Sequence, residues 1–361
     1  MVVFSRTPAV AAAFLVLLSG FPAWAHAFGQ RYDLPLPLWL YALGAGAAVG
    51  LSFAVMAFFI KVKDSRLETA RYDILQWTGA RWLGHPVFLN GLRLLSVAVF
   101  LLILATCFFG NPAPFKNFAP TFVWVIWWVG FAFISALLGN FWDLVNPWNI
   151  IFRWAERMIP AGMSKRKYPR HLGHWPAIVL FLAFAWMELI SDVGEQPRNL
   201  GALIIAYSTI TWAGMAAYGR KTWLRYGEVF SVVFGILSRF APSTGTGKQW
   251  HLRFPGVALI SHEAETPSAI CFVFLLLSSV TFDGILETPS WKSFLEVVAE
   301  SHFLRGGLVF LQQSGINLLK LIETLALFAL PAVFLAVFFA VCWLVGRFGG
   351  EKIPLRTITG F

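Results

Sequence analysis

Seven long apolar runs restrict the fold of this chain more than any other feature of its sequence. Each run is close to or above the roughly 18–20 residues that a helix needs to cross a bilayer. The runs are continuous, whereas the strands of a membrane β-barrel would appear as short alternating segments. The sequence therefore predicts an all-α, polytopic membrane helical bundle of about seven transmembrane helices. The predicted spans are residues 38–60, 92–109, 121–138, 176–192, 200–218, 268–287 and 318–345.

The N-terminal residues 1–25 have the layout of a secretory signal peptide. Arg6 precedes an apolar stretch, and the small residues Ala23 and Ala25 occupy the −3 and −1 positions of a cleavage site. Cleavage there would make His26 the first residue of the mature chain. The alternative is an uncleaved signal anchor, and both alternatives place His26 on the outer side. We expect residues 26–361 to form a single transmembrane helical domain without an internal repeat.

The distribution of basic residues predicts the orientation of the spans. With His26 outside, the loops after the first, third and fifth spans and the C-terminal tail all lie inside, and these four segments hold the clustered Lys and Arg residues. Cytoplasmic loops carry such an excess. The pattern predicts an N-out/C-in topology. It also accounts for the net charge of +10 without a nucleic-acid partner, so the expected partner is the lipid bilayer.

Two predicted spans carry carboxylates near their outer ends. Glu188 and Asp192 are four residues apart in one span, and Asp283 and Glu287 have the same spacing in another. Residues at this spacing share one face of a helix. Paired carboxylates can share a proton, with one of them serving as a general base. These four residues are therefore the predicted catalytic groups, although acids at outer helix ends can also simply face water or pair with arginines.

Other residues predicted on the outer side could bind a divalent metal ion whose identity the sequence leaves open. They are His26 with its new α-amino group, Asp33 and His302. Imidazole and carboxylate ligands suit a hard or borderline divalent cation. The alternatives are that His26 is incidental after a cleavage site and that His302 is a solvated loop residue.

Two interruptions mark the inner loops. Pro147 breaks a helix, and Asn146 beside it can cap the helix that restarts. The segment 228–240 is apolar but too short to cross a bilayer, which predicts a helix lying at the membrane surface.

Three stretches resemble bacterial inner-membrane proteins of the fenitrothion hydrolase family. They are His26–Pro35, Asn146-Pro147-Trp148-Asn149, and Ser279–Gly284 with Glu287-Thr288-Pro289. The resemblance runs through most of the mature chain. It implies an organophosphate-hydrolysing protein of the bacterial inner membrane that works with a second subunit. It carries over no catalytic residues, so the predicted site depends on the topology alone.

Three functions stay open at this point. The chain could hydrolyse phosphotriester-like esters at the outer membrane surface, with the carboxylates and a metal ion activating water. It could be a transporter or metal-handling protein that uses the same acids as an ion path, although the sequence shows no paired broken helices in two halves. It could also be a non-catalytic subunit of a membrane complex.

Overall fold

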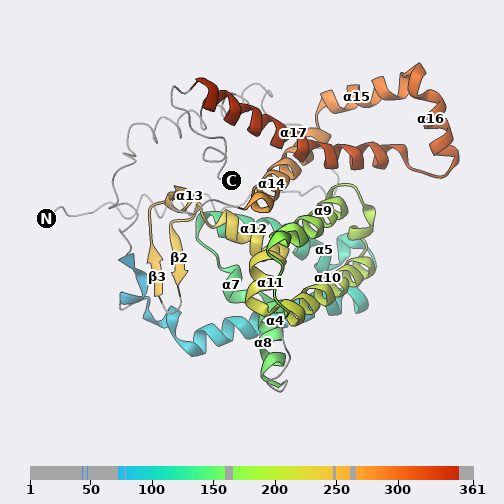
Figure 1. The fold of residues 1–361 in the computed structure, drawn as a ribbon. Helices are drawn as coiled ribbons and strands as arrows, with labels where there is room; N and C mark the ends of the chain where they lie inside the picture. The colour runs from blue at the N-terminus through green and yellow to red at the C-terminus, as the bar shows by residue number, and fades with distance from the viewer. Residues whose placement is uncertain are drawn as a thin grey trace. The chain divides into compact units, whose positions relative to one another are not determined.

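The computed structural model describes residues 43, 47, 72–77, 79–158, 166–246, 249–260 and 266–348 (Figure 1). Contacts divide the chain into two units, Met1–Ala54 and Val55–Phe361. In the first unit the two described residues, Leu43 and Ala47, are helical. The predicted signal peptide, His26, Asp33 and nearly all of the first predicted span lie outside the described residues. The second unit contains all the other described residues.

Six segments within the described residues are long and apolar enough to cross a membrane. They coincide with the second to seventh predicted spans, which confirms the predicted helical architecture of this part of the chain. Their length and composition indicate a multi-pass membrane protein. The segments are α4 (Pro86–Phe109), Phe118–Leu137, Arg170–Leu189, α10 (Pro197–Tyr218), α14 (Pro267–Leu286) and Leu318–Leu344 of α17 (Leu318–Phe348).

Two of these spans are composite. Phe118–Leu137 consists of α5 (Phe118–Thr121), the π-helical segment η5 (Phe122–Val129) and α6 (Gly130–Leu137). Arg170–Leu189 consists of η6 (Arg170–Leu172) and α9 (Trp175–Leu189). A π-helical turn is rare and often marks a functional position, so η5 is a natural place to look for a site.

Shorter elements connect the spans. A small antiparallel sheet has the strand order β1-β3-β2, with β1 at Tyr72–Asp73, β2 at Ser243–Thr246 and β3 at Gln249–Leu252. The short helices are η2 (Ile74–Gln76), η3 (Arg81–Gly84), η4 (Pro114–Lys116), α7 (Trp142–Val145), α8 (Pro147–Met158), η7 (Asp192–Glu195), α11 (Arg220–Tyr226), α12 (Val229–Leu237), α13 (Val257–Ile260), α15 (Pro289–Glu300) and α16 (His302–Gln313).

Local sequence signals explain where the helices begin. Pro86, Pro197 and Pro267 each stand in the first turn of a span, where the missing N–H is not needed. Asn117 caps α5 by accepting a hydrogen bond from the backbone of Ala119, and Glu228 caps α12 in the same way.

The core is aromatic and α12 lies inside it. Val229, Val233 and Phe234 are fully buried and belong to a cluster that also contains Trp142, Trp148, Phe181 and Phe272. The prediction that residues 228–240 lie at the membrane surface is therefore wrong for α12. The physical reason is that α12 is apolar around its whole circumference, and such a helix is stable when it is surrounded by other elements.

The order of elements repeats along the chain, which corrects the expectation of no internal repeat. A pair of spans is followed by α7 and α8, which break at Asn146, and the next pair is followed by α11 and α12, which break at Glu228. Asn-Pro-Trp-Asn-Ile-Ile-Phe at 146–152 matches Glu-Val-Phe-Ser-Val-Val-Phe at 228–234 in residue character.

Candidate functional site

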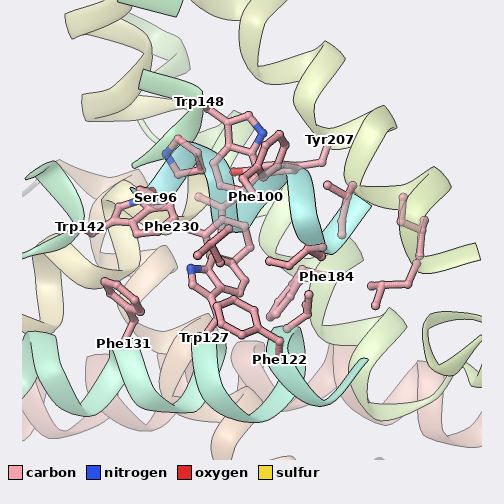
Figure 2. Close-up of a pocket in the computed structure, with 18 of the residues that line it drawn as sticks. Ser96, Phe100, Phe122, Trp127, Phe131, Trp142, Trp148, Phe184, Tyr207 and Phe230 are labelled. Atoms are coloured by element: carbon pink, nitrogen blue, oxygen red, sulfur yellow. The ribbon is translucent and has the colours of Figure 1, made fainter. Parts of the chain in front are cut away.

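A cavity of about 490 Å³ lies among α4, η5, α9 and α10, and the starts of α8 and α12 close one side of it (Figure 2). Its walls are almost entirely apolar. Aromatic rings dominate the lining, namely Phe100, Phe122, Trp124, Trp127, Phe131, Trp142, Trp148, Phe184, Tyr207 and Phe230. This volume is typical of sites for drug-sized ligands, which are concave and mostly apolar.

Helical periodicity places the lining residues. On α4 the lining positions Leu92, Ser96, Val99 and Ile103 recur at intervals of three or four residues, so they form one stripe. On α10 the lining positions follow the same rule from Leu200 to Ile210. The π-helical segment η5 adds the side chains of residues 122–124 and 127 to the opposite wall.

Some lining residues are also exposed, so the cavity communicates with the surroundings at these positions. Leu95 is 60% exposed and Ile210 is 45% exposed. Ala183 on α9 and Ala206 on α10 line the cavity and are exposed as well. All four lie within segments apolar enough to cross a membrane. The mouth of the cavity is therefore framed by apolar side chains.

Aromatic rings from the two repeats, α4 to α8 and α9 to α12, pack against one another. Trp127 lies edge-on to Phe230 with ring centroids 4.5 Å apart, and Trp148 lies edge-on to Tyr207 at 5.1 Å. Trp148 and Phe230, which occupy matching positions after the two helix breaks, stack at 6.2 Å with an interplanar angle of 16°. Such pairs contribute about 0.5–1.5 kcal/mol each beyond the area that they bury, so this wall is held firmly.

The fully buried Glu228 directly precedes the lining residues Val229 and Phe230, and we call this part of the wall the polar end of the cavity, although Glu228 itself does not line it. Its Oε1 accepts hydrogen bonds from the Tyr207 hydroxyl at 2.5 Å and from the backbone N–H of Phe230 at 3.1 Å. Its Oε2 accepts from the backbone N–H of Ser231 at 2.8 Å and from Asn146 Nδ2 at 3.2 Å. Four donors fill the acceptor positions of one ionised carboxylate. Glu228 therefore acts as a structural cap rather than as a base open to a ligand.

Asn146 joins the two helix breaks. It is almost completely buried, and its Oδ1 accepts a hydrogen bond from the backbone N–H of Asn149 at 3.0 Å. Its Nδ2 donates to Glu228 and also lies 3.3 Å from Ser231 Oγ. The amide thus caps its own helix with its oxygen and holds the other helix with its nitrogen.

The structure brings two of the predicted catalytic carboxylates together. Glu188 near the end of α9 and Asp283 near the end of α14 are close enough to interact electrostatically. Neither carboxylate lines the aromatic cavity. The acid pair and the cavity are therefore separate features.

The other predicted site residues that the structure describes are Asp192, Glu287 and His302. Helix α9 ends at Leu189, so Asp192 belongs to η7 and does not share a helix face with Glu188 as the four-residue spacing predicted. Asp192 is exposed and forms an ion pair with Lys320 at 2.5 Å. Glu287 is the exposed C-cap of α14, and His302 is exposed at the start of α16.

Within the residues that the structure describes, no three His, Cys, Asp or Glu side chains are grouped so that they could hold a metal ion. His26 and Asp33 lie outside these residues, so the predicted metal site stays a prediction. No protein-family model, characterised protein or solved structure matches the chain.

Glu228, Tyr207 and the aromatic wall were not predicted from the sequence. One signal was present, because Glu228 is a single acid at the start of an otherwise apolar run, and intramembrane ionisable residues often have a role. Its partner Asn146 is 82 residues away, and nothing in the local sequence of either residue indicates that contact.

Proposed function

We propose that this chain is a multi-pass membrane protein that takes a small apolar molecule from the bilayer into the cavity between α4, η5, α9 and α10. The observation that carries the proposal is the cavity itself, with its aromatic walls and a mouth framed by apolar side chains. A molecule dissolved in the hydrocarbon of the membrane could reach such a mouth laterally. Ser96, one of the few polar residues in the lining, would orient the molecule.

The family resemblance is compatible with this ligand class. Aryl organophosphate esters are apolar, partition into bilayers and carry a ring that can pack against Trp127, Trp148 and Phe230. We propose an ester of this kind as a ligand of the cavity.

Hydrolysis of such an ester is the second candidate function. The observation that favours it is the electrostatic interaction between Glu188 and Asp283. Two neighbouring carboxyls share a proton readily, and one of them can then act as a general base toward water. Because this pair does not line the cavity, hydrolysis would require the ester to bind at a second position or a second subunit to complete the site.

We also propose that residues 1–25 form a signal peptide, that seven spans follow in an N-out/C-in orientation, and that the membrane is the inner membrane of a bacterium. The placement of basic residues in alternate loops supports this topology. Fusions of alkaline phosphatase to successive loops test it. Activity at the loops after the second, fourth and sixth spans supports the topology, and activity at the intervening loops contradicts it.

Quenching of tryptophan fluorescence tests the binding proposal. The purified protein in nanodiscs of neutral lipid is titrated with a nitroaryl phosphotriester, which quenches nearby indoles. Saturable quenching is expected, and Ala206→Phe at the cavity mouth should weaken it about tenfold, because a bulky side chain there excludes the ligand. Ala202→Phe is the matched control, since Ala202 is exposed on the same helix and does not line the cavity. Linear, non-saturable quenching in the wild-type protein, or equal weakening in both variants, would disprove the proposal.

Release of the phenol leaving group tests hydrolysis separately. The assay uses metal-replete protein, with and without any co-purifying subunit. Loss of release in Glu188→Gln and Asp283→Asn, with ligand binding unchanged, supports the acid pair as the catalytic groups. Full release in both variants rules the pair out.

A further inference from the structure

Four arginines gather beside the cavity. Arg93 lies in the second turn of α4, Arg153 and Arg157 lie one turn apart on α8, and Arg220 is the first residue of α11. Partial burial lowers the pKa of Arg153, and the positive charges of Arg93, Arg220 and Arg157 lower it further. The other three guanidinium groups are thus close enough to Arg153 to repel its charge.

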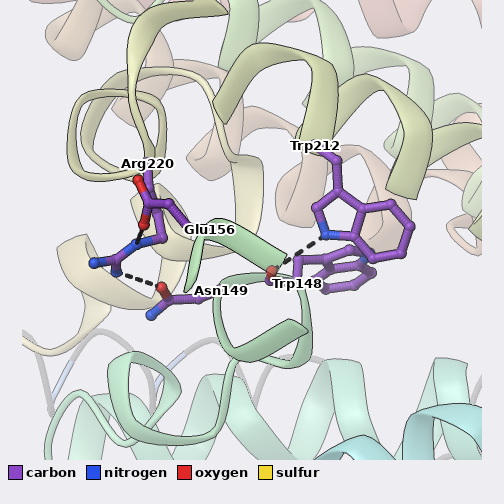
Figure 3. Close-up of polar contacts among 5 residues, drawn as sticks. All are labelled: Trp148, Asn149, Glu156, Trp212 and Arg220. Atoms are coloured by element: carbon purple, nitrogen blue, oxygen red, sulfur yellow. Dashed lines mark hydrogen bonds and ion pairs between the residues drawn. The ribbon is translucent and has the colours of Figure 1, made fainter. Parts of the chain in front are cut away.

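One of these arginines is held rigidly. Arg220 Nη1 donates to Asn149 Oδ1 at 2.7 Å, and its Nε lies 3.3 Å from Glu156 Oε2 (Figure 3). In the part of the chain that the structure describes, Glu156 is the carboxylate that forms an ion pair with the cluster. This ion pair offsets one of the four positive charges of the cluster.

The cluster adjoins the polar end of the cavity wall. Asn149, which binds Arg220, directly follows Trp148, and Trp148 lines the cavity. Figure 3 shows Trp148 beside the Arg220 contacts, with Trp212 Nε1 donating to the Trp148 carbonyl at 3.2 Å. On α4, Arg93 shares a helix face with Ser96 and Phe100, both of which line the cavity.

We infer that the cavity and the arginine cluster together bind an anionic amphiphile, with its apolar part in the cavity and a phosphate or carboxylate headgroup on Arg93 and Arg153. The inference rests on the proposed function, because it assigns a charged end to the same apolar ligand. Guanidinium groups suit such headgroups because they donate two parallel hydrogen bonds to oxyanions. The unbalanced charge of the cluster would be neutralised by the headgroup.

Membrane orientation alone explains basic residues in loops, but it does not explain this arrangement. All four arginines stand on helices, and three of them, Arg93, Arg153 and Arg220, are partly buried. Residues that served only as topology signals would gain from full hydration. The arginine cluster lies beside an apolar cavity, and a ligand with a charged headgroup and an apolar tail would contact both.

Competition against the nitroaryl probe tests the inference in nanodiscs of neutral lipid. Dodecyl phosphate should displace the probe at a concentration about tenfold lower than dodecanol, since charge-assisted hydrogen bonds are about twice as strong as neutral ones. Excess inorganic phosphate should remove this advantage by occupying the arginines, without affecting dodecanol. Arg93→Gln and Arg153→Gln should each reduce the advantage severalfold while the probe itself still binds. Arg153→Lys, which keeps the charge, should restore part of it.

Arg170→Gln is the matched control, because Arg170 is an exposed cation in η6, outside the cluster. An equal loss in this control would mean general attraction of anions to a basic surface, and it would overturn the inference. Equal potency of dodecyl phosphate and dodecanol in the wild-type protein would also overturn it. Failure of the probe to bind at all would instead disprove the proposed function.

The headgroup could belong to a membrane phospholipid or to a free amphiphile, and nanodiscs that contain phosphatidylglycerol separate these sources. Loss of the dodecyl phosphate advantage in anionic nanodiscs supports occupation of the cluster by a lipid headgroup. Persistence of the advantage supports selection of a free anionic amphiphile.

Discussion

The two helix breaks of this protein are built alike but differ in charge. At the α7–α8 break, Asn146 accepts a hydrogen bond from the backbone of the residue three positions later at 3.0 Å. At the α11–α12 break, Glu228 does the same at 2.8 Å. The amide also donates to the carboxylate at 3.2 Å. The Glu228 carboxylate only accepts hydrogen bonds, whereas the Asn146 amide both donates and accepts, so the two side chains can bond to each other. Two carboxylates at this point would repel each other.

The helices after the two breaks are used differently. Helix α12 is apolar all round and fills the core, with Val233 and Phe234 fully buried. Helix α8 buries Trp148 and Ile150 and carries Arg153 and Arg157, two of the four arginines of the cluster. The same kind of side-chain cap is thus followed by packing residues in α12 and by charged residues beside the cavity in α8.

The strongest test of this comparison is Glu228→Ala, which removes the charged cap. Four donors would then lose their acceptor in a buried setting, so we expect a loss of about 3–5 kcal/mol in the free energy of unfolding. The apparent midpoint of thermal unfolding in detergent measures the effect. Glu296→Ala is the control, because Glu296 is exposed on α15. If the midpoint of Glu228→Ala is no lower than that of the control, the carboxylate does not hold the two helix breaks together.

Asn146→Asp makes the two breaks alike in charge. A second carboxylate beside Glu228 should cost about 2–3 kcal/mol at neutral pH, because like charges in a shared buried site raise the pKa of one of them. A raised carboxyl pKa in the folded state means that the folded protein binds the extra proton more tightly. Stability should therefore recover as the pH falls and be lost as it rises. The midpoint of thermal unfolding across pH 5–8 measures this, and Asn146→Ala, which lacks the second charge, should show no comparable pH dependence.

Tyr207→Phe removes one of the four donors to Glu228 and leaves the aromatic wall in place. The expected loss is about 1–2 kcal/mol, the usual effect of deleting one hydrogen bond to a buried charged group. Binding of the nitroaryl probe should be retained, since the ring that packs against Trp148 remains. A loss of probe binding larger than the loss of stability would mean that the hydroxyl contacts the ligand, so that Glu228 and its partners belong to the site and not only to the fold.

The spans could be predicted from the sequence because a bilayer tolerates only continuous apolar helices of sufficient length. Length alone does not distinguish a short helix at the membrane surface from a short helix buried in the core, which is why the prediction for α12 is wrong. The repeat was missed because matching positions keep their character and not their identity, as Trp148 and Phe230 do.

The candidate site was only partly predictable. Glu188 and Asp283 were expected to be on the same side, and the structure brings them together. The aromatic cavity arises from packing among elements far apart in the chain. Its polar end depends on a contact between residues 146 and 228, which no local pattern specifies.

The smallest expected effect concerns Asn149 and Ser231, the matching residues three positions after the two caps. Asn149 Oδ1 accepts the 2.7 Å hydrogen bond from Arg220, whereas Ser231 Oγ receives only a long contact of 3.3 Å from Asn146. Asn149→Ala should therefore cost about 1 kcal/mol and Ser231→Ala less than about 0.5 kcal/mol. Thermal unfolding in detergent measures both. If the order is reversed, the arginine cluster contributes less to the fold than the contact between the two breaks, and the polar face of α8 is then free to change without loss of stability.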